Sequence, residues 1–201
     1  MDKLLKSISF IFHPVIMPLL GVVFYFSKTP RAIPEEIIWA KLISIGILTT
    51  ILPILLYFLL KTIGKVQTIY LETAQERVFP LAINCFIIFL IITRVLPDNE
   101  ILELHFFFVG ILASTLACLI LAILKFKASI HMLALGGILM FIIALSIHYS
   151  KNFNGTLALM SIICGAVATS RLHLEAHSYK ELIIGFALGM LPQLIMVNYW
   201  L

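Results

Sequence analysis

Charged side chains are scarce in this sequence of 201 residues. Lys and Arg number 14 and Asp and Glu number 10, which together make 12% of the chain, whereas 62% of its residues are hydrophobic. Ordinary soluble domains carry about 25% charged residues. The composition therefore excludes a typical water-soluble protein, and a mean hydropathy of +1.11 indicates a chain that resides in a membrane.

Cysteine pairs, repeats and polar domains are missing as well. Cys85, Cys118 and Cys164 each lie inside an apolar run without a CxxC or Cys/His spacing, so we expect buried structural thiols. The first apolar run has no small-x-small cleavage site, so we expect it to be retained. Since no internal repeat and no soluble domain is recognisable, we expect a single integral membrane domain over residues 1–201.

Long apolar runs are what the sequence has instead. Seven windows of about 16 to 23 residues contain no Asp, Glu, Lys or Arg, and about 20 apolar residues span a bilayer as a helix. The predicted fold is an all-α, polytopic transmembrane helical bundle with six or seven membrane segments, placed in the cell membrane. The expected segments cover residues 7–27, 42–60, a third ending near 94, 104–124, a fifth from 131 to about 149, 156–169 and 182–201.

Local features qualify several of these segments. Two prolines four residues apart interrupt the first, which either spans the membrane or turns back within it, and Pro53 is expected to kink the second. Residues 61–76 carry apolar positions at helical spacing among polar ones, which predicts an amphipathic helix at the interface. Gly136 and Gly137 permit a close helix contact within the fifth segment.

The net charge of +4 does not require nucleic acid as a partner. The basic residues stand at the ends of the apolar runs, where they anchor a helix to lipid headgroups. We therefore expect the bilayer and a lipid substrate as partners, and no nucleic acid.

One stretch, Ser170 to Gly189, concentrates titratable groups between two apolar runs. Charges at membrane depth are costly unless they face a cavity or one another, so such a cluster predicts a functional site. His177 and Glu181 are four residues apart and are expected to share one helix face. The carboxylate would then accept the proton of one ring nitrogen and leave the other nitrogen free to attack. Arg171 suits a phosphate or a carboxylate.

Two other polar clusters are expected on the same side of the membrane. Arg77, residues 127–131 and residues 171–181 are each separated from the next by two membrane crossings. An even number of crossings returns the chain to the same face, whether or not the first segment spans. The three clusters should therefore meet.

The third cluster carries a recognisable motif. Ser170, Arg171 and His177 have the spacing Ser-Arg-x5-His, and Glu181 follows four residues after the histidine. With the other two clusters, this resembles the signature of the phosphatidic acid phosphatase type 2 and haloperoxidase superfamily, whose pattern is Lys-x6-Arg-Pro, Pro-Ser-Gly-His and Ser-Arg-x5-His-x3-Asp. Glutamate at position 181 replaces the aspartate of the family.

The other two motifs are matched in part. Ser129 and His131 keep the serine and histidine of the second motif, whose proline and glycine are replaced. Arg77 stands for the arginine of the first motif, without the proline after it and without the lysine seven positions before it. Lys127 or Lys65 would supply that missing charge.

The resemblance implies a metal-independent phosphatase that acts on a lipid phosphate or diphosphate and needs no cofactor. It implies that His177 attacks phosphorus to form a phosphohistidine, that Glu181 orients His177, and that His131 protonates the leaving alkoxide. The residues that it implies for holding the phosphate oxygens are Arg77, Arg171, Ser129 and Lys127. Positioned cations and donors are what the spread charge of a transferring phosphoryl group requires. Phosphatidate, phosphatidylglycerol phosphate and isoprenyl diphosphate are equally open as substrates.

Two other interpretations stay open. His173 and His177 are four residues apart, a spacing at which two imidazoles on one helix bind zinc, so a zinc-dependent membrane hydrolase is an alternative. The departures in the first two motifs suit a binding or scaffolding protein that has kept the fold without catalysis. His13, His105 and His148 are expected to be packed or interfacial residues without a special role.

Overall fold

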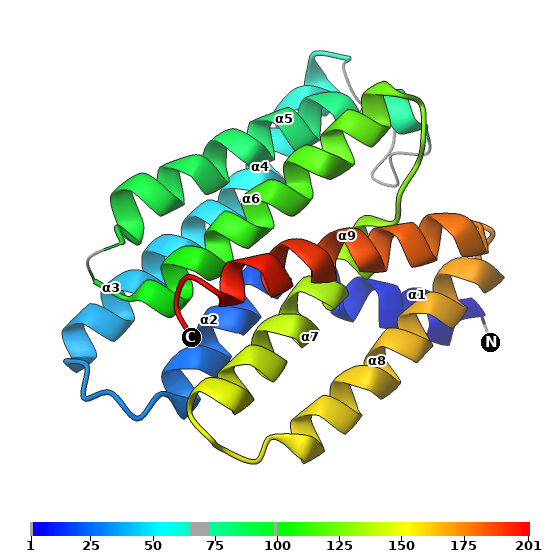
Figure 1. Cartoon of the computed structure of the whole chain (residues 1–201). Helices are drawn as coiled ribbons and strands as arrows, with labels where there is room; N and C mark the ends of the chain where they lie inside the picture. The colour runs from blue at the N-terminus through cyan, green and yellow to red at the C-terminus, as the bar shows by residue number, and fades with distance from the viewer. Residues whose placement is uncertain (1, 65–72, 99) are drawn as a thin grey trace.

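The computed structural model describes residues 2–64, 73–98 and 100–201, and every regular element within these ranges is helical (Figure 1). The α-helices are α1 Asp2–Ile11, α2 Met17–Lys28, α3 Glu35–Gly46, α4 Leu52–Thr62, α5 Ala74–Leu90, α6 Leu102–Ile123, α7 Ile130–His148, α8 Asn154–His173 and α9 Tyr179–Val197. Two π-helical stretches, Ile47–Ile51 and Ile91–Val95, join α3 to α4 and extend α5.

Six continuous helices in the described part of the chain are long and apolar enough to cross a membrane. They are Glu35–Thr62, Ala74–Val95, Leu102–Ile123, Ile130–His148, Asn154–His173 and Tyr179–Val197. This confirms an all-helical chain with six segments of membrane-spanning length, the lower of the two numbers that the sequence predicts.

The first predicted segment is two helices rather than one. The chain bends over residues 12–16, between α1 and α2, around Pro14. Pro18 stands at the start of α2, where its missing N–H interrupts no helical hydrogen bond. At about 1.5 Å per residue, the 12 residues of α2 rise about 18 Å, well short of the roughly 30 Å hydrocarbon core. α2 is therefore too short to cross the membrane alone, and it packs along α7.

The disturbance expected at Pro53 is present as a π-helical stretch directly before it. A proline ring clashes with the carbonyl four residues earlier and offers no N–H to it. The wider π turn at Ile47–Ile51 relieves this clash, and Thr49 donates its hydroxyl to the Ile45 carbonyl at 2.8 Å. The segment begins at Glu35 rather than at 42, since two glutamates in its first turn complement the helix dipole.

The predicted amphipathic helix over 61–76 falls mostly on residues 65–72, which lie outside the described residues. α4 ends at Thr62, and Gly64 has a φ of +73°, in the left-handed region that favours glycine. On the other side, the Thr73 hydroxyl accepts the N–H of Glu76 and begins α5. α4 therefore does not continue into such a helix.

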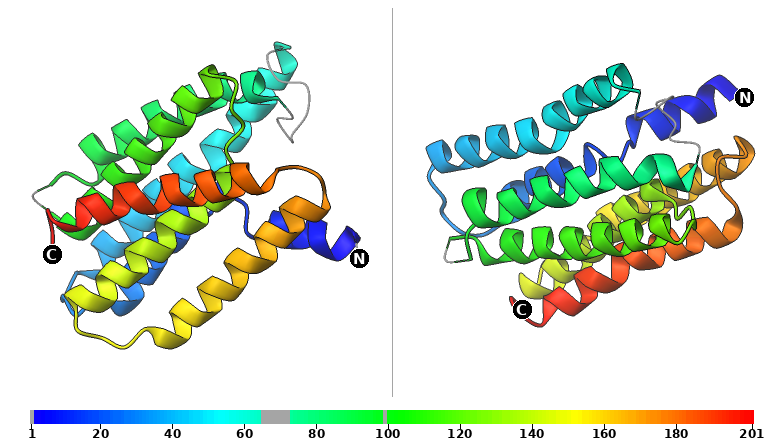
Figure 2. Two further views of the ribbon diagram at one scale, coloured as in Figure 1. Left: turned by 45° about the vertical axis from the view of Figure 1, so that its right-hand side comes forward. Right: turned by 90° about the horizontal axis from the view of Figure 1, so that it is seen from above.

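α9 lies along α7 and α6, and glycines set the short distance between α7 and α9 (Figures 1 and 2). A Cβ atom added at Gly136 would stand 2.4 Å from the carbonyl oxygen of Phe186. A Cβ at Gly189 would stand 1.9 Å from that of Leu133. The close approach predicted from Gly136 and Gly137 is confirmed, because only glycine lets the two backbones meet at this distance.

The two ends of the bundle differ in what they gather. The α6–α7 and α8–α9 connections and the start of α5 lie at the end that is on the right in Figure 1. The opposite end holds the C-terminus, the end of α2 and the start of α6. The first of these ends carries all three clusters that the sequence singles out.

Candidate functional site

Two hydrogen bonds join the three clusters at this end of the bundle. Arg77, in the first turns of α5, donates from Nη1 to the carbonyl of Ala128 at 2.8 Å. The N–H of Ser129 donates to the carbonyl of Glu181 at 3.0 Å. Helix α5, the α6–α7 connection and the start of α9 are thereby held together, as the count of membrane crossings predicts.

His177 and Glu181 are paired, but not as neighbours on one helix face. α8 ends at His173, and His177 precedes Ser178, the N-cap of α9, so the predicted shared helix face is wrong. The chain reverses here because Ser178 and Glu181 form a capping box, in which Glu181 Oε2 accepts the Ser178 N–H at 2.9 Å. The same Oε2 lies 3.1 Å from His177 Nδ1.

The pairing fixes the tautomer of His177. An ionised carboxylate only accepts hydrogen bonds, so Nδ1 carries the proton and the lone pair is on Nε2. The His177 side chain is 1% exposed. Burial is the main reason that the pKa of His177 is lowered to about 3, and the cations that lower it further are Arg77, Arg171 and Lys127. The imidazole is therefore neutral near pH 7, the state in which it is a nucleophile.

His131 is positioned by α1. Its Nε2 lies 3.1 Å from the carbonyl of Ser9, and since a carbonyl only accepts, Nε2 carries the proton. The hydroxyl of Ser9 is in turn 2.7 Å from that of Ser170, which also donates to the Leu5 carbonyl at 2.7 Å. Ser170 therefore joins α8 to α1, and α1 holds the ring of His131.

His13 is a member of the site that the sequence does not reveal. Its ring lies edge-on to the ring of His131, with centroids 5.5 Å apart. The residue stands in the bend between α1 and α2, and its Nδ1 accepts the N–H of Val15. In sequence it has no polar neighbour, which is why it is expected to be a packed residue. Its position before Pro14, where a helix must break, is the only signal that could have exposed it.

Two residues predicted to bind phosphate do not line the cavity. Ser129 is fully buried and caps α7, where its hydroxyl accepts the N–H of Met132 at 3.4 Å. Lys127 lies half-buried in the α6–α7 connection beside His177. Glu181 stands behind His177. None of the three is among the described residues that line the cavity.

A cavity of about 340 Å³ opens beneath the site. Its polar end is lined by the side chains of His13, Arg77, His131, Arg171 and His177. Its walls are mainly apolar residues of α2, α4, α5, α6 and α7. Two arginines and a neutral histidine at one end of an otherwise mainly apolar cavity fit a ligand with an anionic head and a hydrocarbon body.

The geometry required for the zinc alternative is not met. His173 is the last residue of α8 and is exposed, whereas His177 is buried beyond the turn, so the two imidazoles do not share a helix. Within residues 2–64, 73–98 and 100–201, no three His, Cys, Asp or Glu side chains are grouped so that they could hold a metal ion.

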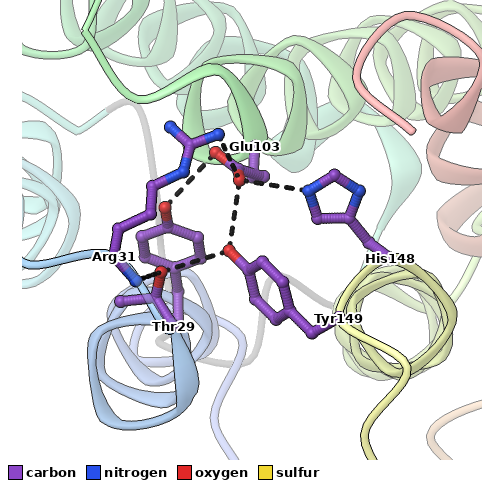
Figure 3. Close-up of polar contacts among 6 residues, drawn as sticks. Thr29, Arg31, Glu103, His148 and Tyr149 are labelled. Carbon is purple, nitrogen blue, oxygen red and sulfur yellow. Dashed lines mark hydrogen bonds and ion pairs between the residues drawn. The ribbon is translucent and has the colours of Figure 1, made fainter.

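A second buried polar cluster lies at the opposite end of the bundle, around Glu103 in the first turn of α6 (Figure 3). The Glu103 side chain is 1% exposed. Its Oε1 is 2.9 Å from Arg31 Nη2 and 3.5 Å from His148 Nε2, and it accepts the Tyr149 hydroxyl at 3.1 Å. Its Oε2 accepts the Tyr25 hydroxyl at 3.3 Å.

This cluster joins α2, the segment after it, α6 and the end of α7. Thr29 lies 3.2 Å from the hydroxyl of Tyr149, and burial raises the pKa of that phenol, which keeps it a donor. The sequence places Glu103 in a polar connection and His148 at an interface. The buried role of Glu103 depends on residues far apart in the sequence, so local pattern does not reveal it.

Comparison with family models, curated proteins and solved structures finds no match to this chain. The fold and the six apolar helices define the class as a multi-pass helical membrane protein. What the protein does has to be inferred from its site.

Proposed function

We propose that the protein is a metal-independent lipid phosphate or diphosphate phosphatase of the cell membrane that works through a phosphohistidine intermediate. The observation that carries the proposal is His177, whose Nδ1 is held by Glu181, at the polar end of an apolar cavity. Arg77 and Arg171 line the same end. The motif resemblance supports the same chemistry.

The first step is attack of His177 Nε2 on phosphorus. A bond forms between nitrogen and phosphorus, and the bond between phosphorus and the bridging oxygen of the lipid breaks. The leaving oxygen takes up a proton from Nδ1 of a protonated His131, whose ring is held by the hydrogen bond from its Nε2–H to the Ser9 carbonyl. The guanidinium groups of Arg77 and Arg171 stabilise the charge on the oxygens of the transferring group.

The second step is hydrolysis of the phosphohistidine. Water attacks phosphorus, the bond from phosphorus to nitrogen breaks, and His131 takes a proton from the water, which restores it for the next cycle. Glu181 stabilises the positive charge on the His177 ring in the intermediate, because its carboxylate faces Nδ1 at 3.1 Å. Inorganic phosphate leaves.

A lipid-phosphate binding protein without turnover is the second candidate. The observation that favours it is Ser129, whose hydroxyl is engaged in capping α7 and is fully buried rather than directed at a ligand. Arg77 and Arg171 would then hold a phosphate that no residue attacks.

Phosphate release by detergent-purified protein separates these candidates. Incubation with phosphatidate or an isoprenyl diphosphate, in the presence of a chelator, should release phosphate, and vanadate should inhibit the release because it mimics five-coordinate phosphorus. His177→Ala should abolish release, and His173→Ala, at the exposed end of α8, is the matched control that should retain it. Substrate binding without release by the wild type would favour the second candidate.

A further inference from the structure

The cavity beneath the site is long, and its charged groups are all at one end. Its lining on α5 runs from Arg77 to Ile88, and its lining on α6 runs from Cys118 to Phe107. Each run covers twelve residues, whose eleven steps rise about 16 Å at 1.5 Å per residue. This depth is about half of the roughly 30 Å hydrocarbon core of a bilayer, which is the thickness of one leaflet.

The deeper wall is mainly apolar, and Asn84 on α5 is the one amide side chain among its described lining residues. The hydroxyl groups of Thr49, Ser114 and Thr115 each donate to the carbonyl four residues earlier in their own helix. The side chains around them are mainly aliphatic residues from four helices. A ligand that fills this part of the cavity is therefore a hydrocarbon chain, whose burial is favourable in proportion to its area.

Phe107 forms the floor. Among the described lining residues of α6 it is the one nearest the start of the helix, and it is 2% exposed. Its ring stacks on Phe141 with centroids 4.1 Å apart, and a Cβ added at Gly21 would stand 2.6 Å from its Cζ. The ring is thus held from two sides, and Glu103, whose cluster is described above, lies one turn beyond it on α6.

Helix α4 forms one side of the cavity, between the cavity and the outside of the bundle. Ile54 and Phe58 line the cavity, and 46% and 58% of their surface is accessible. Both are apolar, so a lipid in the bilayer meets an apolar face on this side.

We propose that the cavity holds a single hydrocarbon chain of the lipid phosphate, and that Phe107 limits the length of the chain that fits. This inference rests on the proposed function for the position of the phosphate, between Arg77 and Arg171. The substrate class is then a lipid phosphate whose chain has about the length of an acyl chain in one leaflet. Longer chains must leave part of their length outside the cavity.

Straight-chain alkylphosphonates of increasing length test this with the detergent-purified protein. They have no bridging oxygen between carbon and phosphorus, so binding is measured without hydrolysis. Each methylene that enters an apolar cavity should raise affinity by about fourfold. For the wild type, affinity should rise with length and then stop rising when the chain reaches Phe107.

Phe107→Ala and the milder Phe107→Leu should move this limit to longer chains, and Ile138→Phe should move it to shorter ones. Phe106→Ala is the matched control, because Phe106 stacks on Tyr199 and is not among the described lining residues. An unchanged limit in all three cavity variants would overturn the proposal, as would an affinity independent of chain length in the wild type. A length limit that shifts as expected in a protein that releases no phosphate would contradict only the proposed function.

Discussion

The chemistry proposed for this protein depends on the orientation of one imidazole. Glu181 Oε2 accepts from His177 Nδ1 and from the Ser178 N–H, so one carboxylate serves the ring and the helix cap together. Glu181→Gln keeps a side chain that can cap the helix, and it removes the charge that fixes the ring. Turnover should fall by about 10²-fold or more, the scale of orienting and general acid–base groups, while the melting temperature changes little.

Phosphate release under saturating substrate measures this effect. Glu175→Gln is the matched control, since Glu175 is exposed in the connection between α8 and α9. Unchanged turnover in Glu181→Gln, beside an inactive His177→Ala, would mean that another group orients the histidine.

His177 also makes the stability of the fold depend on pH. Its pKa is about 3 in the folded protein, compared with about 6.5 for an ordinary histidine. Between these values the unfolded chain binds a proton that the folded chain does not, so the folded state loses stability as the pH falls through this window. Acidification below about pH 6.5 therefore destabilises the folded protein.

Melting temperatures of the wild type and His177→Gln, recorded from about pH 7 to about pH 4, isolate this contribution. The wild type should lose stability relative to the variant as the pH falls. A difference that stays constant, or that grows in favour of the wild type, would show that His177 takes up its proton at an ordinary pH.

At the residue scale, the sequence predicts the parts of the site that lie in compact motifs. Arg77, His131 and His177 come together as expected. Two membrane crossings separate each cluster from the next, so the chain returns to the same face of the membrane. His13 and Glu103 are not predicted. Their partners belong to other helices, and only tertiary packing brings an isolated polar residue to its partner.

Among the elements, α7 and α9 make the closest contact. Gly189→Ala would place a methyl group 1.9 Å from the backbone oxygen of Leu133, so the helices would have to separate. Overpacking of this kind costs about 1–3 kcal/mol, and the melting temperature should fall. Gly165→Ala in α8 is the control, because a Cβ there meets nothing within 4 Å. An equal response of the two variants would contradict the close contact of α7 with α9.

The Glu103 cluster joins α2, α6 and the end of α7 at the opposite end of the bundle. Glu103→Gln keeps the shape of the side chain but weakens the hydrogen bonds from Tyr25 and Tyr149, so we expect a loss of about 1–3 kcal/mol. The control is Glu100→Gln, since Glu100 is 46% exposed in its ion pair with Lys41 and should contribute about 0–1 kcal/mol. Thermal unfolding in detergent compares the two. Equal losses of stability in the two variants would mean that the hydrogen bonds of Glu103 do not hold the helices together.

Element boundaries follow from physics that the sequence carries only in part. The sixth segment is predicted over 156–169, yet α8 continues to His173, because Arg171 is buried inside the bundle rather than left at the interface. Arg171 therefore belongs to the candidate site and does not indicate the end of helix α8. Ser178 ends the turn, and its capping box with Glu181 is readable from the spacing alone.

The whole molecule is a helical bundle with different polar groups at its two ends. One end gathers arginines and histidines over a cavity, and the other buries a carboxylate, with an apolar interior between them. The all-α class and the six long apolar helices follow from the charge-free runs, because no other regular structure satisfies the backbone of a single apolar segment in a bilayer. The apolar runs of the sequence do not predict that α1 lies next to the site.

The most direct measurement is to trap the intermediate. Purified protein is mixed with a lipid phosphate that carries radiolabelled phosphorus, turnover is stopped with alkaline denaturant, and labelled peptides are mapped. We expect a transient label on His177 that is stable to alkali and lost in acid, present in His173→Ala and absent in His177→Ala. Phosphate release without a label on His177, or with the label on another residue, would contradict it.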